Sequence, residues 1–291
     1  MNILRASHLG MCFGVRDAID LAVRQADAAP LTVLGDLVHN ETVLADLRAR
    51  GITIAMDPSE VRTQAVMITA HGASERRLAA TRARGLDVVE ATCPLVHVAH
   101  KAIAALRRDG YHPVIIGQRD HVEVRGLTED LDAFDVVLDE ADVDALAYRP
   151  RLGVASQTTQ PLERVRRLTE RIRRRFPQSD VRLIDTVCLP TKQRQQAAVD
   201  LAAASDVVIV VGGANSNNTR ELVQTCGHRC ARVHHVQAAS DLRADWFEDA
   251  GTVGITAGTS TPDAVVDAVE ARVRQLAAIA QHATPAVASG R

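Results

Sequence analysis

The sequence predicts a parallel α/β protein built from three similar units. Strand-like and helix-like segments alternate along the chain, a pattern typical of parallel sheets with crossover helices. Apolar residues make up 46% of the 291 residues and aromatic residues only 2%, so valine, alanine, leucine and isoleucine must form the cores. This composition favours buried parallel strands covered by alanine-rich helices. Three isolated cysteines, separated by 81 and 95 residues, indicate that the three units share one centre.

Short apolar runs mark the expected strands, because they have the length and the residue types of buried β-structure. We expect strands at 31–35, 65–69, 88–91, 113–116, 152–155, 181–184, 207–211 and 253–256. The run NILRASHLGM near the start also has strand character, and the stretch 117–148 is rich in strand and loop signals. No run reaches the ~18–20 apolar residues that a membrane-spanning helix needs.

Helices are expected between the strands, where apolar residues recur at steps of three and four. FGVRDAIDLAVRQA follows Cys12, and LPTKQRQQAAVDLAAASD follows Cys188. Two further periodic segments contain Val96, Ala99, Ile103 and Leu106, and Val265, Val269, Val273 and Leu276. The arginine-rich segment 163–176 has an apolar stripe of Val165, Leu168 and Ile172. This stripe favours a solvated helix face over a docking surface for an acidic partner.

No linker rich in proline, glycine or serine separates these elements. We therefore place the domain boundaries just after Cys93 and Cys188, where a strand ends and the next unit can begin. The expected domains are 1–93, 94–188 and 189–283. The small residues of 284–291 predict a flexible tail.

Charge and cysteine content exclude several classes of protein. The chain has 34 basic and 36 acidic residues, a net charge of −2, and almost no aromatic residues for stacking on bases. We therefore expect no nucleic-acid partner. The absence of a signal-peptide pattern and the odd number of cysteines favour a reducing cytoplasm and no membrane association.

Cys12, Cys93 and Cys188 each follow a strand-like run and precede a helix-like run. Thiolates are favoured at helix N-termini. Structural zinc usually takes four ligands with a closely spaced cysteine pair, which these three lack, although zinc held by them and a histidine stays open. An iron–sulfur cluster bound by three cysteines would leave one iron without a protein ligand, able to bind a substrate oxygen. The spacing alone leaves redox and dehydration chemistry open.

Polar residues gather where the strands end. They lie at His71-Gly72, at QRDHVE after VIIG, at 156–159, at 212–218 and at 258–260. Parallel sheets bind ligands at the carboxyl ends of their strands, where glycine admits a ligand and helix N-termini attract anions. The pattern therefore predicts a phosphate or diphosphate site.

Each of these segments alone has a structural explanation. GGANSNNT is as typical of a turn and helix cap as of a phosphate loop. His71 alone is typical of a surface histidine or of a hydrogen-bonded core histidine. His39 could simply precede an N-cap residue, Asn40. His121 and Glu123 could be a chance pair, but in an extended loop residues two apart project to the same side and would face one pocket.

The chain resembles the 4-hydroxy-3-methylbut-2-enyl diphosphate reductases, which catalyse the last step of the non-mevalonate isoprenoid pathway. The resemblance runs from about Ile3 to Leu276. It is carried by GMCFGVRDAI (10–19), LVHNETV (37–43), TAHG (69–72), EATCPLV (90–96), HVEVRG (121–126), SQTT (156–159), the C-x-x-T-x-x-R-Q pattern 188–195, GGANSNN (212–218) and TAGTSTPD (256–263).

The resemblance implies three α/β domains arranged as a pseudo-threefold trefoil around a central [4Fe–4S] cluster. The matching ligands are Cys12, Cys93 and Cys188, and one iron has no protein ligand. The implied reaction removes the substrate hydroxyl with two electrons and two protons and yields isopentenyl and dimethylallyl diphosphate.

The resemblance also implies roles for the polar residues. Glu123 matches the acid of a proton relay, Thr158 the residue that contacts this acid and the substrate alcohol, and His121 an active-site histidine. The residues that match the diphosphate-binding set are His39, His71, Ser216, Asn218 and Ser260. Three positions depart from the common pattern: Phe13, Val122 and Asn217.

The implied partners are the allylic diphosphate and an external electron donor such as a ferredoxin or flavodoxin, acting on a monomer. Two alternatives stay open at this point. One is a quinolinate-synthase-like iron–sulfur lyase, which the diphosphate loop and the His-x-Glu pair disfavour. The other is a non-catalytic iron–sulfur sensor, which would not need Glu123 and Thr158.

Overall fold

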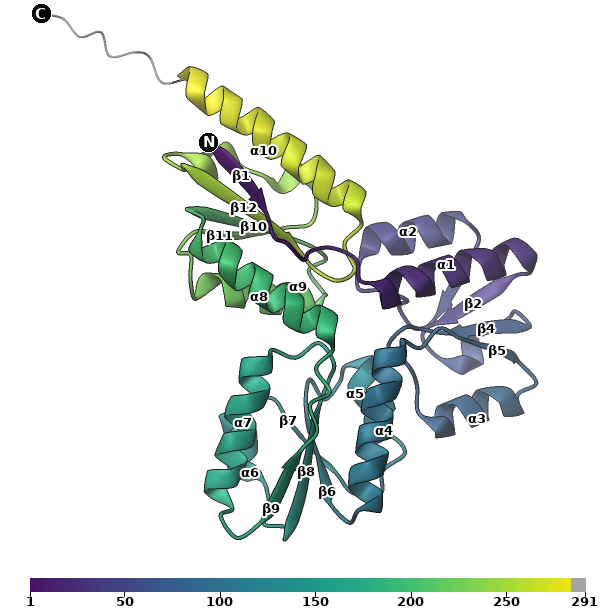
Figure 1. Cartoon of the computed structure of the whole chain (residues 1–291). Helices are drawn as coiled ribbons and strands as arrows, with labels where there is room; N and C mark the ends of the chain where they lie inside the picture. Colours follow the sequence, from purple (N-terminus) through teal and green to yellow (C-terminus); the bar gives the residue numbers. More distant parts are fainter. Residues whose placement is uncertain (284–291) are drawn as a thin grey trace, which may run out of the picture. The chain divides into compact units, whose positions relative to one another are not determined.

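A computed structural model describes residues 1–283, and the side chains of residues 1–277. Strands and helices alternate along the chain and form three four-stranded parallel sheets, each with its own helices (Figure 1). The chain divides into two compact units, Phe13–Lys192 and Met1–Cys12 with the chain from Gln193 onward. The α/β fold with three sheets, predicted from the alternation, is confirmed.

The first sheet of the unit Phe13–Lys192 has the strand order β3-β2-β4-β5. These strands are β2 (Leu31–Leu34), β3 (Thr53–Ala55), β4 (Ala65–Ile68) and β5 (Asp87–Glu90). The helices of this part are α1 (Phe13–Ala28), α2 (Glu41–Ala49) and α3 (Glu75–Ala83), with a short 3₁₀ turn, η1, at Pro58–Glu60. The central strand β2 is buried along its whole length, which explains its uninterrupted apolar sequence LTVL.

The second sheet of the same unit has the order β7-β6-β8-β9. Its strands are β6 (His112–Ile116), β7 (Asp135–Val137), β8 (Arg151–Ser156) and β9 (Asp180–Leu183). Its helices are α4 (Pro94–Arg108), α5 (Val122–Thr128), α6 (Glu140–Ala145) and α7 (Leu162–Arg175). Alternate residues of β6 enter two different cores, since Val114 packs with α6 and α7 and Ile115 packs with α4 and α5.

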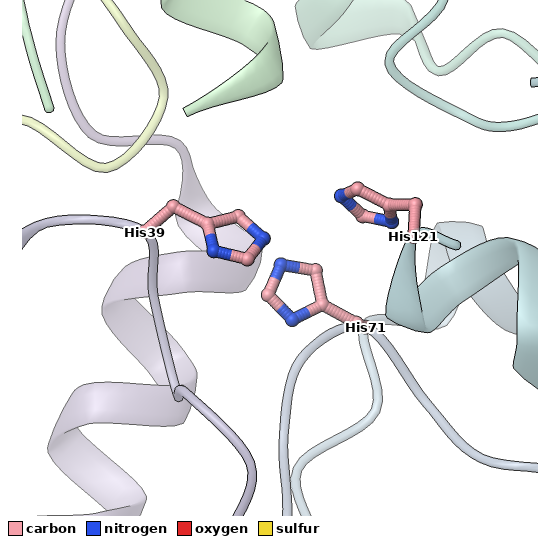
Figure 2. A group of neighbouring side chains, drawn as sticks. All are labelled: His39, His71 and His121. Carbon is pink, nitrogen blue, oxygen red and sulfur yellow. The ribbon is translucent and has the colours of Figure 1, made fainter. Parts of the chain in front are cut away.

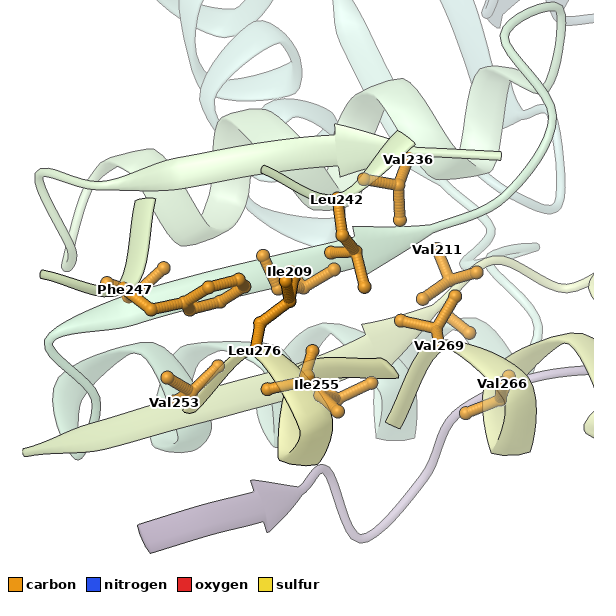
Figure 3. Close-up of a cluster of buried hydrophobic side chains, with 13 residues drawn as sticks. Ile209, Val211, Val236, Leu242, Phe247, Val253, Ile255, Val266, Val269 and Leu276 are labelled. Carbon is orange, nitrogen blue, oxygen red and sulfur yellow. The ribbon is translucent and has the colours of Figure 1, made fainter. Parts of the chain in front are cut away.

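The third sheet belongs to the other unit and has the order β1-β12-β10-β11. Its strands are β1 (Asn2–Arg5), β10 (Val207–Val211), β11 (Val233–Val236) and β12 (Thr252–Ala257). The associated helices are α8 (Leu189–Ala203), α9 (Asn217–Gly227) and α10 (Asp263–Ala283), with 3₁₀ turns η2 (Ala239–Asp241) and η3 (Ala244–Phe247). Figure 3 shows Ile209, Val211 and Ile255 among the side chains that pack against α10.

All the strands expected from the apolar runs are present, with bounds that differ by a residue or two. The first strand, however, does not join the sheet that follows it in sequence. β1 pairs with β12, with Ile3 opposite Val253, so residues 1–12 lie with the C-terminal unit and not within an N-terminal 1–93 domain. The rest of the domain division stays a prediction, and the expected flexible tail lies outside the described residues. Within those residues, no helix combines the length and the apolarity needed to cross a bilayer.

Candidate active site

The three isolated cysteines all lie at helix N-termini, as their sequence context predicts. Cys12 directly precedes α1, Cys93 is the N-cap of α4, and Cys188 directly precedes α8. Each is half-buried, and none forms a disulfide. The peptide N–H groups and the dipole of a helix N-terminus stabilise a thiolate. These positions therefore suit sulfur ligands of a metal or cluster.

Cys93 is held against the start of α1 by a close contact that requires glycine. A Cβ atom on Gly14 would lie 2.6 Å from the Sγ atom of Cys93, which is closer than any real Cβ contact. The backbone N–H of Cys93 donates to the carbonyl oxygen of Ala70 at 3.0 Å. The glycine in the CFG sequence thus makes room for this thiol.

Cys188 is connected to Thr158 through the backbone. Its N–H donates to the carbonyl oxygen of Thr158 at 3.0 Å, and its Sγ atom lies 3.1 Å from the hydroxyl of Thr191. Thr191 is fully buried, so its hydroxyl has a fixed position beside the sulfur. Thr191 belongs to the C-x-x-T-x-x-R-Q pattern, which gave it no role of its own.

Cys12 is positioned in the other unit by a glycine turn. The N–H of Cys12 donates to the carbonyl oxygen of Thr259 at 3.2 Å, and Gly10 has a φ of 73°. The guanidinium of Arg194 donates to the Gly10 carbonyl from Nη2 at 2.7 Å and from Nε at 3.1 Å. Arg194 is 5% exposed. It fixes the loop before Cys12, a role that the sequence did not reveal.

Cys226 and Cys230, in contrast, are packed in the hydrophobic core between α9 and the third sheet. The Cys226 thiol lies 3.8 Å from the carbonyl oxygen of Ala198, and burial raises the pKa of Cys226 to about 12. A thiol with so high a pKa stays protonated and is a poor metal ligand. Both cysteines belong to the hydrophobic core of this unit.

Three histidines from separate loops form a cluster. His39 precedes α2, His71 follows β4, and His121 is the N-cap of α5. The ring centroids are 4.9 Å apart for His39 and His71, 5.4 Å for His39 and His121, and 5.5 Å for His71 and His121. Figure 2 shows the three rings directed toward one another. One nitrogen from each ring lies within 4.8 Å of the other two, so the cluster could hold a metal ion or an anion.

The charge of this cluster is limited by burial. Desolvation, together with repulsion from His39 and His121, holds the pKa of His71 well below its usual value. His71 is therefore neutral at pH 7 and can offer one N–H donor. The Nδ1 atom of His121 accepts a hydrogen bond from the N–H of Glu123 at 3.1 Å, which leaves Nε2 as the donor of the neutral ring.

Glu123 is a buried acid with a raised pKa. Its side chain is 2% exposed, and its Oε1 atom accepts a hydrogen bond from the backbone N–H of Thr158 at 2.7 Å. Burial raises the pKa of Glu123 to about 7, although the hydrogen bonds from Thr158 favour the carboxylate. A carboxyl group with this pKa can hold or release a proton at neutral pH.

Glu123 reaches this position differently from the expectation. It lies in the first turn of α5 and not in an extended loop, because His121 caps this helix. Residues two apart in a helix do not project to the same side. His121 and Glu123 are instead linked by the bond from the Glu123 N–H to the His121 ring.

The predicted anion-binding residues of the third sheet lie at the ends of β10 and β12. Ser216 is the N-cap of α9 and accepts a hydrogen bond from the N–H of Thr219 at 3.3 Å. The Oδ1 atom of Asn218 accepts from the N–H of Thr259 at 3.0 Å. Ser216, Asn218 and Ser260 are 3–4% exposed. These polar side chains and the first N–H groups of α9 are typical of a phosphate site.

Two glycines near these residues allow a close approach to α9. A Cβ atom on Gly212 would lie 2.3 Å from the hydroxyl oxygen of Thr219, and one on Gly258 would lie 2.2 Å from it. Glycine is therefore required in both loops for the helix to begin where it does. Gly212 of GGANSNN and Gly258 of TAGTSTPD thus have a packing role.

The structure brings some of the predicted residues together. Within the unit Phe13–Lys192, His39, His71 and His121 form one cluster, and Glu123 and Thr158 form a hydrogen-bonded pair. In the other unit, Ser216 and Asn218 lie at the N-cap and in the first turn of α9, after β10, and Ser260 lies in the loop after β12. Sequence reasoning missed the roles of Gly14, Thr191 and Arg194. The available signal was their short distance in sequence from Cys12 or Cys188.

Comparisons with known proteins agree with this geometry. The LytB protein family matches residues 3–274. The 4-hydroxy-3-methylbut-2-enyl diphosphate reductase of Pelobacter propionicus is 34% identical over 278 residues, covering 95% of this chain and 99% of the relative. The protein of the same name from Geobacter sp. strain M21 is 36% identical over 276 residues, covering 94% and 97%.

Solved structures show the same likeness. The E-1-hydroxy-2-methyl-but-2-enyl-4-diphosphate reductase of Plasmodium falciparum superposes with a TM-score of 0.86 at 25% identity, over 91% of this chain and 86% of that chain. A second structure, of (E)-4-hydroxy-3-methyl-but-2-enyl diphosphate reductase, has a TM-score of 0.66 at 31% identity, over 94% and 100%. The chain belongs to the LytB family.

Proposed function

We propose that this member of the LytB family is an iron–sulfur oxidoreductase that converts 4-hydroxy-3-methylbut-2-enyl diphosphate to isopentenyl and dimethylallyl diphosphate. The reaction takes up two electrons and two protons, breaks the C–O bond of the allylic alcohol, and releases the oxygen as water. The observation that carries this proposal is the buried Glu123 carboxyl, because a hydroxide leaves readily only when it is protonated.

The proposed cofactor is a [4Fe–4S] cluster held by Cys12, Cys93 and Cys188, with one iron that has no protein ligand. The helix N-terminal positions of the three cysteines fit this group, and Gly14 leaves space at the Cys93 sulfur. Such a cluster supplies single electrons and an open iron for the substrate oxygen. Cys226 and Cys230 do not belong to the ligand set, because both are packed in an apolar core.

The proposed diphosphate site uses neutral donors. His39, His71 and His121 would offer ring N–H groups, and Ser216, Asn218 and Ser260 would offer hydroxyl and amide groups. The lowered pKa of His71 supports hydrogen bonding by a neutral ring rather than attraction by a cation. Neutral donors hold the anion without a strong counter-charge. A strong counter-charge would slow product release, because the product carries the same diphosphate.

Glu123 is proposed to donate the proton to the leaving hydroxyl. Thr158 orients it, because its backbone N–H fixes one carboxyl oxygen at 2.7 Å. The Thr158 hydroxyl is proposed to contact both Glu123 and the substrate alcohol. His121 is tied to the same helix turn by its bond with the Glu123 N–H, so ring and carboxyl keep a fixed relation. A non-catalytic sensor would not need the buried acid Glu123 or its partner Thr158.

The electrons are proposed to come from an external carrier such as a ferredoxin or flavodoxin. We further propose that the protein acts as a monomer in the cytoplasm, where a reducing environment keeps the cysteines available for the cluster.

The experiment that tests this function is an anaerobic assay of the cluster-loaded protein with a chemical reductant. The allylic alcohol diphosphate should yield both five-carbon diphosphates, and the free alcohol should bind far more weakly. Ser216→Ala and Asn218→Ala should weaken binding of the diphosphate more than Asn217→Ala does. Equal affinity for the diphosphate and the free alcohol would reject the proposed pocket.

A further inference from the structure

The end of strand β11 lies beside the loop that follows β10, the GGANSNN loop (212–218). In the third sheet β11 is the edge strand next to β10, with Val236 opposite Val211 (Figure 1). The backbone pairing of the two strands extends to the N–H of Gly212, which donates to the carbonyl oxygen of Val236 at 2.9 Å. Past this point, side chains from β11 and from the residue after it bind the loop.

Two side chains continue the pairing beyond the strand. The ring Nε2 atom of His235 lies 2.8 Å from the carbonyl oxygen of Gly212. A carbonyl oxygen can only accept, so the His235 ring donates from Nε2. The side-chain oxygen of Gln237 accepts from the N–H of Ala214 at 3.1 Å. The peptide bonds before and after Gly213 are therefore both held from the side of β11.

These two bonds determine the direction of the Gly213 N–H. The C=O and the N–H of a trans peptide point to opposite sides. The Gly212 carbonyl points to His235, so the N–H of the same peptide, which belongs to Gly213, points away from β11. Because β10 lies between β11 and β12, this N–H is on the side of β12. The loop after β12 carries Ser260.

The preceding peptide shows the same alternation. The carbonyl oxygen of Val211 accepts from the N–H of Gly258 at 2.9 Å and from the hydroxyl of Thr261 at 3.1 Å, both in the segment after β12. Gly212 also packs directly against Thr219 at the start of α9. The first residues of the GGANSNN loop are thus fixed by β11, by the loop after β12 and by α9.

The N–H of Gly213 has no hydrogen-bond partner among the residues that the structure describes. Gly213 is nevertheless buried. Buried peptide N–H groups are almost always paired, so an exception calls for a ligand or a water molecule. Ser216, the N-cap of α9 and a proposed diphosphate donor, follows three residues later in the same loop. The unpaired N–H therefore belongs to the loop that would hold the anion.

We propose that His235 and Gln237 are positioning residues of the diphosphate site. They hold the loop from the side of β11, so that the N–H of Gly213 donates to the diphosphate alongside Ser216 and Asn218. Neither side chain has to touch the substrate. This inference rests on the proposed function and adds to its anion site one backbone donor and the two side chains that orient it.

A purely structural role for the two side chains makes a different prediction. Loss of a structural contact lowers stability and reduces the amount of active protein, without a specific effect on phosphate binding. Loss of a positioning contact weakens the binding of the diphosphate in the substrate and in the transition state alike. The KM for the allylic diphosphate should then rise while kcat is kept.

Calorimetric titration of the cluster-loaded chain with inorganic diphosphate tests the proposal. His235→Leu removes the donor to the Gly212 carbonyl and should weaken binding about tenfold, the scale of one hydrogen bond to a charged group. His235→Gln should restore most of the affinity, because its amide can donate from nearly the same place. Gln237→Met removes the acceptor at an exposed position and should also weaken binding, which keeps the test decisive if His235→Leu does not fold.

His234→Leu is the matched control on the same strand. Adjacent residues of a strand face opposite sides of the sheet, and the His234 ring stacks on Trp246 with the ring centroids 4.0 Å apart. This variant should bind inorganic diphosphate like the wild type, even if its thermal unfolding midpoint is lower. An equal loss of affinity in His234→Leu and His235→Leu would refute the positioning role.

Ser216→Ala separates failure of this inference from failure of the proposed diphosphate site. If Ser216→Ala weakens inorganic diphosphate while His235→Leu and Gln237→Met bind it like the wild type, the positioning role is refuted and the site stands. If all three variants bind it like the wild type, both are refuted. Hydrogen exchange tests the donor itself, because bound inorganic diphosphate should slow exchange of the Gly213 amide. Unchanged exchange of this amide at saturation would refute its assignment as a donor.

Discussion

At the scale of single residues, Glu123 shows how burial prepares a proton donor. The carboxyl is 2% exposed, and the hydrogen bond from the Thr158 N–H compensates only part of the lost hydration. The pKa therefore rises to about 7. The histidine cluster shows the same effect with the opposite sign, since burial lowers the pKa of His71. Both shifts favour the neutral form of the group.

The raised pKa of Glu123 predicts a pH-dependent stability. The folded protein binds this proton up to about pH 7, whereas the unfolded chain releases it near the ordinary value of 4.5. The free energy of unfolding should therefore fall between these values as the pH rises. A shift of this size corresponds to about 3 kcal/mol at most. Glu123→Gln should remove this dependence.

Urea unfolding of wild type and Glu123→Gln across this pH range measures the effect. The difference in unfolding free energy should change in favour of Glu123→Gln as the pH increases toward 7, and then level off. Parallel pH profiles for the two proteins would show that Glu123 has an ordinary pKa.

The sequence located the chemistry of these residues but not their geometry. The order of motifs placed His121, Glu123 and Thr158 in one site. It could not show that His121 caps α5, because a cap depends on the backbone angles. The same residues can occur in an extended loop or at the start of a helix. The roles of Thr191 and Arg194 depend on partners that only the folded chain reveals.

At the scale of elements, the strands that the apolar runs missed are short strands at sheet edges. The strands at the sheet interiors, such as β10 with its sequence VVIVV, are apolar throughout and were predicted. The edge strands β3, β7 and β11 were not predicted, whereas the edge strands β5 and β9 were. The three missed strands have only three or four residues, and β11 reads VHHV, so they carry no apolar run. Their pairing with a central strand determines them.

The junction between α1 and Cys93 yields a prediction at this scale. Gly14→Ala would place a methyl group 2.6 Å from the Cys93 sulfur, so either the start of α1 or the thiol must move. We expect Gly14→Ala to lose iron and sulfide during purification. Gly227→Ala is the matched control, because a Cβ atom there meets nothing within 4 Å.

Iron and sulfide analysis with visible absorption spectra measures this effect. Gly227→Ala should retain wild-type cluster content. If Gly14→Ala retains it as well, then the contact with Cys93 does not constrain the cluster site.

At the scale of the whole molecule, the order of the chain and the order of the sheets differ. Three sheets were predicted from the alternation of elements and the spacing of the cysteines. The pairing of β1 with β12 was not, because the strand Asn2–Arg5 is equally compatible with either neighbouring sheet and its partner lies at the far end of the chain. This pairing puts Cys12 in the same compact unit as the chain from Gln193 onward.

The account of the whole molecule predicts a sharp division among the five cysteines. Cys12→Ser, Cys93→Ser and Cys188→Ser should each lose or destabilise the cluster, whereas Cys226→Ser and Cys230→Ser should retain it. The latter two should instead lower stability, because a hydroxyl would replace a thiol in an apolar core. Cluster content and thermal unfolding of the five variants separate these effects. Loss of the cluster in Cys226→Ser with retention in Cys12→Ser would contradict the ligand assignment.

The most direct test of the proposed function is the turnover of Glu123→Gln with its cluster verified intact. Glutamine keeps the shape of Glu123 and an oxygen to accept from the Thr158 N–H, but it has no acid proton to donate. We expect diphosphate binding to persist and turnover to fall about 10²–10⁴-fold. Thr158→Val, which retains the backbone N–H, should lose less. Near wild-type turnover of Glu123→Gln would contradict the assignment of Glu123 as the proton donor.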